Sequence, residues 1–172
     1  MDTLTVFALQ LILSLAVYAL IARWYVSPWL ATKPIRLALI ALTLPHAFRH
    51  LGLAFLVPGL VAPELPSSFA AAAAYGDFLS GLLALLTLVA LRRRWRLALP
   101  LAWLFNIVGS MDLVNALRQA DAVPHLLTTW YIPTFWVPLL LTTHAMSFAR
   151  LLRHASRRSV GQGEALVPAA QT

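Results

Sequence analysis

Long apolar runs separated by short polar or basic stretches form the main pattern of this chain. Five of them reach the roughly 20 residues that an α-helix needs to cross the hydrocarbon core of a bilayer. These runs cover residues 4–22, 35–61, 69–91, 97–117 and 123–152. The pattern predicts an all-α, polytopic integral membrane protein. We expect a compact bundle of five transmembrane helices over residues 1–154 and a flexible cytoplasmic tail over residues 155–172.

Composition agrees with a membrane protein and excludes several other classes. Hydrophobic residues make up 60% of the 172 residues and charged residues only 11%, whereas soluble domains carry about 25% charged residues. The net charge is +7, but the basic residues flank apolar runs and form no single basic face, so nucleic acid is excluded as a partner. The chain has no cysteine, which excludes disulfides, thiolate chemistry and cysteine-ligated zinc.

Basic residues alternate between the connections and predict the orientation of the chain. Arg23, Lys33 and Arg36 follow the first run, and the second connection has no Lys or Arg. The third connection and the end of the fifth run are again rich in arginine. The positive-inside rule therefore predicts an external N-terminus and a cytoplasmic C-terminus. We expect a location in the cell membrane, or in the inner membrane if the source is bacterial.

Ionisable and amide side chains inside the runs are the candidates for function, because each charge costs about 2.5–3.5 kcal/mol on insertion scales. A rise of 1.5 Å per residue places Asp112, Asp77 and Arg49 roughly 8, 12 and 16–18 Å from the external ends of their helices. The second, third and fourth helices thus bring their charges to one zone that opens outward. His125 is expected at the external boundary and His144 near the cytoplasmic one.

Helical angles refine the candidate site. His46, Arg49 and His50 have the spacing i, i+3, i+4 and would share one stripe of an α-helix. Asp112 and Asn115 lie about 60° apart on the fourth helix. We therefore expect the second helix to present both histidines and Arg49 to the carboxylates of its neighbours.

The charges of this cluster do not balance. Arg49, Asp77 and Asp112 sum to one negative charge, which is costly in an apolar medium. A protonated histidine or a protonated carboxyl group would cancel it and make an acid/base or proton site. A bound cation would instead make a metal site, for which His46 and His50 have acceptable spacing. The structural alternative is an ion pair without function, with the histidines bonded to carbonyl groups that prolines release.

The favoured hypothesis is a pocket that opens outward and binds a small amphiphilic or lipid-like molecule, with its transformation by proton transfer as an additional activity that the same residues would allow. His50 would act as acid or base beside His46, oriented by Asp77 or Asp112. Candidate ligand-binding residues are Arg49, which would hold an anionic group or pair with one Asp, the amides Asn106 and Asn115, and the aromatic residues Tyr131 and Trp136.

Two other functions stay open. One is a proton- or ion-relay subunit for transport or within a larger membrane complex, and the other is a metal-dependent membrane enzyme that uses His46 and His50. The sequence does not decide whether the protein is an enzyme, which cofactor or metal it uses, or which ligand it takes. It also leaves open whether the lipid-embedded chain forms a homo-oligomer.

Three segments carry a resemblance to a known family. They are LPHAFRHLG on the second run, FNIVGSMDLVNA on the fourth and TTWYIPTFWVP on the fifth. With five spans and an external N-terminus, they resemble the sterol-isomerase and sigma-2-receptor type of bundle. The resemblance implies a pocket for sterol-like molecules with intramembrane histidine and acidic residues. It covers the architecture more than any motif, since Arg49 and His50 stand where that family has an acid.

Overall fold

A computed structural model describes residues 1–164, with side chains for residues 1–157. Within residues 1–164 the chain is helical and forms no strand. The elements are α1 (Thr3–Ile21), the π-helical turn η1 (Ala22–Val26), α2 (Ser27–Ala31), α3 (Ile35–Thr43), the 3₁₀ segment η2 (Leu44–Leu56), α4 (Ser67–Arg92), α5 (Ala98–Leu117), the 3₁₀ segments η3 (Ala120–His125) and η4 (Leu127–Trp130), the π-helical turn η5 (Ile132–Trp136) and α6 (Val137–Glu164).

Five continuous helical stretches are long and apolar enough to cross a membrane. They cover Thr3–Ala31, Ile35–Leu56, Ser67–Arg92, Ala98–Leu117 and Leu127–Arg157. The number of spans therefore agrees with the five apolar runs of the sequence. The windings change from α-helical to 3₁₀ beside Pro45 and to π-helical around Pro133, because a proline removes one backbone donor and obstructs the regular ladder.

Three boundaries differ from the sequence prediction. The second span ends at Leu56 rather than residue 61, because Val57 has extended backbone angles before Pro58. The fifth span begins four residues later than expected, after the separate turn η3. Helix α6 continues to Glu164, past the expected start of the tail at residue 155. The rest of that tail, residues 165–172, lies outside the described residues.

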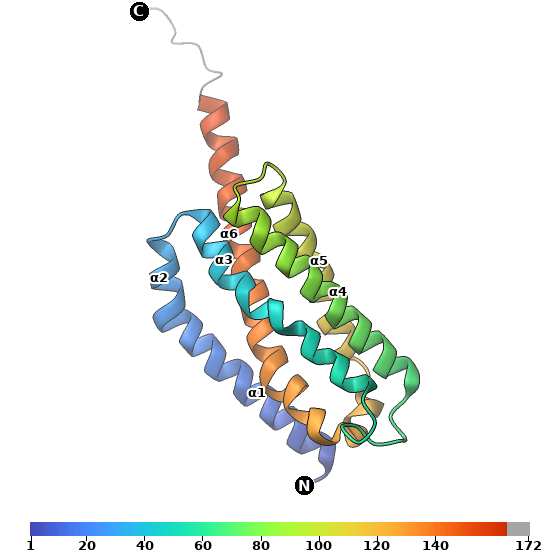
Figure 1. The fold of residues 1–172 in the computed structure, drawn as a ribbon. Helices are drawn as coiled ribbons and strands as arrows, with labels where there is room; N and C mark the ends of the chain where they lie inside the picture. Colours follow the sequence, from blue (N-terminus) through green and yellow to red (C-terminus); the bar gives the residue numbers. More distant parts are fainter. Residues whose placement is uncertain (165–172) are drawn as a thin grey trace, which may run out of the picture.

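Helix α4 lies along one side of the bundle and packs most extensively against η2 and α5 (Figure 1). Helix α6 crosses the bundle and packs against α3, α5 and α1. Helix α1 is peripheral, and Phe7 is its one buried residue. Helix α1 also contacts η3 and η5, which lie at the end of the bundle where the N-terminus is.

The 3₁₀ winding of η2 decides which side chains of the second span face the interior. A 3₁₀ helix has three residues per turn, so every third residue lies on one face. The buried residues of η2 follow this period and are His46, Arg49, Gly52 and Phe55. His50 is exposed, with its Nδ1 3.1 Å from the carbonyl oxygen of Ala47. The expectation that His50 shares the stripe of Arg49 is wrong, because it assumed the α-helical period of 3.6.

Acidic residues and most basic residues lie at opposite ends of the bundle. The end where the N-terminus lies, with the loops before α4 and after α5 (Figure 1), holds Asp2, Glu64 and Asp121 together with Arg118. The opposite end holds most of the basic residues of the described chain: Lys33 and Arg36 near the α2–α3 turn, Arg92, Arg93, Arg94 and Arg96 at the α4–α5 turn, and Arg150, Arg153 and Arg157 on α6.

Candidate functional site

A buried ionic cluster joins three spans near the N-terminal half of the bundle. Arg49 of η2, only 1% exposed, donates from Nε to Oδ1 of Asp77 on α4 at 2.7 Å. Its Nη2 donates to Oδ2 of Asp112 on α5, and its Nη1 donates to the carbonyl oxygen of Gly109 at 3.0 Å. All three guanidinium nitrogens are therefore occupied within the protein. The convergence of these three charges, expected from their depth, is confirmed by both ion pairs.

Glycines bring the backbones close enough for these ion pairs. A Cβ atom at Gly52 would lie 2.5 Å from Cβ of Asp77, which no side-chain rotation relieves. A Cβ atom at Gly76 would overlap Oδ1 of Asp112 and lie 2.7 Å from its Cγ. The ionic cluster therefore requires glycine at position 52 of η2 and at position 76 of α4, in addition to the charged residues.

A second polar layer lies directly beside the ionic cluster. The rings of His46 and His144 lie against each other at a centroid distance of 4.1 Å, tilted by 51°, and both contact the ring of Phe105. His144 also lies next to Arg49, because a Cβ atom at Gly109 would be 2.7 Å from Nε2 of His144 and 2.9 Å from Nη1 of Arg49. Charge cluster and histidine pair therefore form one continuous polar interior.

Hydrogen bonds fix which ring nitrogens carry protons in the neutral histidines. Asn106 donates from Nδ2 to the carbonyl oxygen of Ala102, so its Oδ1, 2.8 Å from Nδ1 of His144, accepts a proton from that nitrogen. Thr143 donates its hydroxyl to backbone carbonyls of its own helix, so its oxygen accepts from Nε2 of His46 at 2.9 Å. The unprotonated nitrogens are then Nε2 of His144 and Nδ1 of His46.

Neither of these two acceptor nitrogens has a hydrogen-bond partner. Three buried hydroxyl groups within the described part of the chain also lack one; they belong to Thr43, Ser80 and Ser147. Buried polar atoms without partners each cost about 1–3 kcal/mol and are uncommon in folded proteins. Five such atoms therefore lie in the buried part of the described chain, on His46, His144 and three hydroxyl-bearing residues.

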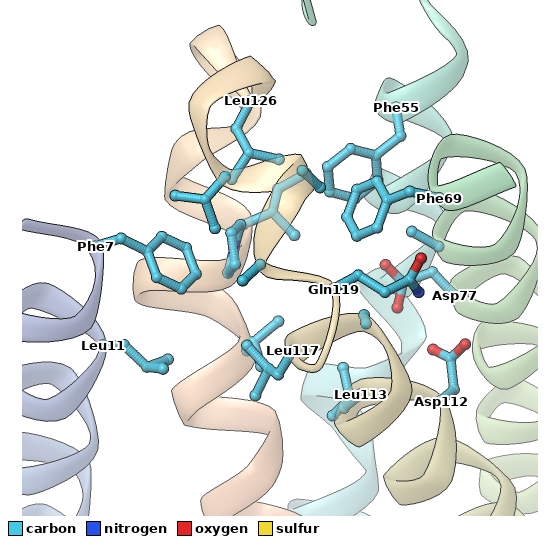
Figure 2. Close-up of a pocket in the computed structure, with 18 of the residues that line it drawn as sticks. Phe7, Leu11, Phe55, Phe69, Asp77, Asp112, Leu113, Leu117, Gln119 and Leu126 are labelled. Atoms are coloured by element: carbon cyan, nitrogen blue, oxygen red, sulfur yellow. The ribbon is translucent and has the colours of Figure 1, made fainter. Parts of the chain in front are cut away.

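An apolar cavity of about 220 Å³ ends at the two carboxylates. Phe7 and Leu11 of α1 lie across it from Asp77 and Asp112 (Figure 2). The remaining wall is mostly aliphatic and aromatic, and the amide of Gln119 is its other polar group. An apolar cavity of about 150 Å³ is enough to hold benzene, so this cavity has room for the apolar part of a small ligand.

The other predicted ligand-binding residues do not line this cavity. Asn106 is fully buried and serves His144, and Asn115 is exposed and borders a shallow groove with Asp112 on the outer side of α5. Tyr131 is 71% exposed, and Trp136 packs against Phe48. Arg49 is not free to hold an anionic ligand group, because its nitrogens already bond to Asp77, Asp112 and Gly109.

His144 is the interior residue that sequence reasoning placed wrongly. It was expected near the cytoplasmic boundary, but it is the eighteenth of the 31 residues of Leu127–Arg157, and His46 is the twelfth of the 22 residues of Ile35–Leu56. Both histidines therefore lie near the middle of their spans. The late start of the fifth span and the long extension of α6 caused the error. The tripeptide Thr142-Thr143-His144 in an apolar run was the available signal.

The geometry does not favour the metal hypothesis. In the part of the chain whose side chains the structure describes, no group of three or more His, Cys, Asp or Glu residues is placed to hold a metal ion. His46 and His50 point to different sides of η2, so they do not form a pair of ligands.

Comparison with known proteins gives a family and no described activity. No curated protein and no solved structure gives a significant match to the chain. The model of one family, Domain of unknown function (DUF8737), matches residues 6–152, which cover most of each of the five apolar helices. The chain therefore belongs to the DUF8737 family.

Proposed function

We propose that this protein is a five-span integral membrane protein that binds a small amphiphilic molecule in the cavity beside Asp77 and Asp112. The N-terminus would be external and the C-terminus cytoplasmic, because most basic residues lie at the end of the bundle where the C-terminal part of α6 is. The cavity would then open toward the external half of the membrane.

The chemistry of the cavity favours a ligand with an apolar body and a cationic or hydrogen-bond-donating head. Both charged groups on its wall are carboxylates, and Arg49, which bonds to both of them, does not line it. With all three groups ionised, the cluster carries one excess negative charge. An ammonium group at the carboxylates would balance this charge and would pair with them as the guanidinium group of Arg49 does. Two carboxylates that share one buried arginine at the end of an apolar cavity are the observation that carries the proposal.

Any proton transfer to the ligand would fall to Asp112 rather than to His50. Asp112 borders the cavity and keeps 16% of its side chain exposed, whereas His50 lies on the other side of η2. A carboxyl group in reach of the ligand is the geometric requirement for a general acid or base.

Three eight-carbon probes test the ligand chemistry. In a neutral detergent we expect octylamine to bind more tightly than octanol, and octanol more tightly than octanoate, because only the amine cancels the excess charge. Asp112→Asn should weaken octylamine binding about tenfold, since a hydrogen bond to a charged group contributes about 1.5–3 kcal/mol, and should leave octanol binding nearly unchanged. Isothermal titration calorimetry measures both.

The exposed carboxylate of Asp121, at the same end of the bundle, supplies the matched control. Asp121→Asn should not change octylamine binding. Ala116→Leu, which extends a cavity-lining side chain and leaves every charge in place, should weaken all three probes. Equal affinity for octylamine and octanoate, or equal effects of the two Asp variants, would contradict the proposal.

A proton relay is the second candidate function, and the unpartnered interior atoms favour it. His144 and His46 each present an unprotonated nitrogen without a partner, and Ser80 and Ser147 have free hydroxyl groups in the same interior. Acceptors and hydroxyl donors of this kind, next to an ionic cluster, are the groups from which intramembrane proton paths are built.

Proton flux into vesicles distinguishes the relay from simple binding. Under a potassium diffusion potential, vesicles with the protein should acidify faster than empty vesicles, as measured with an internal pH-sensitive dye. His144→Leu should reduce the rate to that of empty vesicles, because it removes the acceptor beside Arg49. His125→Leu, at the end of η3, is the control and should keep the full rate. A wild-type rate equal to that of empty vesicles would rule out the relay.

A further inference from the structure

A basic pocket lies at the end of the bundle opposite the ionic cluster. It has a volume of about 320 Å³ and lies between the α2–α3 turn and α6. Its cationic lining residues are Lys33, Arg150, Arg153 and Arg157, joined by His154. The remaining lining residues are apolar, and none is acidic. The pocket therefore combines several positive charges with an apolar wall and no internal counter-charge.

Contacts between distant parts of the chain hold two of these cations, Arg150 and Lys33, in place. Nη2 of Arg150 donates to the carbonyl oxygens of Leu30 at 2.7 Å and Lys33 at 3.0 Å, which ties the α2–α3 turn to α6. Nζ of Lys33 lies 5.4 Å from the ring centroid of Trp29, a distance typical of a cation–π contact. The pocket is thus held by two elements that are about a hundred residues apart in sequence.

The charges of the pocket are not neutralised by the protein. Among the side chains of residues 1–157, both ion pairs belong to Arg49, so none involves Lys33, Arg153 or Arg157. Like charges held together repel one another, and the repulsion is relieved by an anion that several donors share. Guanidinium groups suit phosphate in particular, because their planar donors match its oxygens in pairs.

We propose that this pocket binds a phosphate-bearing anion, with the phosphate group between Lys33 of the turn and Arg153 and Arg157 of α6. The wall formed by Pro34 and Ile35 would contact the organic part of the same molecule. A phospholipid headgroup and a soluble phosphate ester present the same chemistry to these donors, and the experiment below separates them. The site is independent of the cavity at Asp77 and Asp112.

The test follows thermal unfolding of the full-length protein in a neutral maltoside detergent. Dioleoylphosphatidylglycerol, dioleoylphosphatidylcholine or soluble glycerol phosphate is added in increasing amounts. We expect the anionic lipid to raise the Tm in a saturable way and the zwitterionic lipid to have little effect. The double variant Arg153→Gln/Arg157→Gln should need about thirtyfold more anionic lipid for half of the effect, because each basic residue at an anionic surface contributes about fivefold in affinity.

A matched double variant separates a built site from general attraction between charges. Arg93→Gln/Arg96→Gln removes the same charge from exposed residues at the same end of the bundle, outside the pocket. It should keep the wild-type lipid dependence. Equal weakening in both double variants, or a Tm that no anion raises, would overturn the proposal. Stabilisation by glycerol phosphate as strong as that by the lipid would support the pocket and assign it to a soluble phosphate ester.

Discussion

Arg49→Met is expected to lower the free energy of unfolding by about 3–5 kcal/mol. The change removes the positive member of a buried cluster and leaves Asp77 and Asp112 facing each other without a counter-charge. It also leaves the carbonyl oxygen of Gly109 without its donor. Denaturation in mixed detergent micelles, followed by circular dichroism, measures the loss.

Two further variants show that the loss comes from unpaired charge. Arg118→Met removes an exposed arginine at the end of α5 and should change stability by less than about 0.5 kcal/mol. Adding Asp77→Asn and Asp112→Asn to Arg49→Met should restore part of the lost stability, because no buried charge then remains. If Arg49→Met is as stable as Arg118→Met, the cluster has no structural role.

Gly52→Ala is expected to destabilise the protein by about 2–3 kcal/mol. The new methyl group would lie 2.5 Å from Cβ of Asp77, so η2 has to move away from α4 and lengthen the bond from Arg49 to Asp77. The same denaturation measurement applies, and octylamine affinity should fall together with stability because Asp77 moves.

Gly81→Ala is the matched control for this prediction. It adds the same methyl group on the opposite side of the same interface, where the nearest atom is the backbone nitrogen of His50 at an ordinary 3.5 Å. Alanine also favours helix over glycine by about 1 kcal/mol, so this variant should be neutral or more stable. Equal losses in Gly52→Ala and Gly81→Ala would contradict the steric account.

The depth of charged residues was predictable from the sequence, but the faces of the second span were not. Counting residues at 1.5 Å each placed Asp77 and Asp112 at similar depth, because α4 and α5 are regular helices. Arg49 was placed near them because two differences offset each other: its span ends at Leu56 rather than residue 61, and its 3₁₀ winding rises about 2.0 Å per residue. In η2 the prediction of which residues share a face failed, because no pattern in the sequence indicates a 3₁₀ run of 13 residues. Such runs normally end after three or four residues. The change of period removed His50 from the site.

Tertiary packing decided the remaining features. The fifth apolar run reads as one helix, but residues 120–136 form three short segments before α6 begins, and this shift brings His144 level with His46. The cavity depends on α1 standing beside these irregular segments, which no pattern within α1 indicates. Tyr131 was predicted to bind a ligand because it is aromatic, but the local winding of the chain directs its side chain outward, where it is exposed.

The unusual winding of the second span also matches its length to that of its main neighbour. Thirteen residues at about 2.0 Å per residue and nine at about 1.5 Å give Ile35–Leu56 a length of about 40 Å. The 26 residues of α4, wound as a regular helix, reach about 39 Å. A stretch that is four residues shorter thus extends as far as its partner, and hydropathy windows tuned to regular helices would underrate its reach.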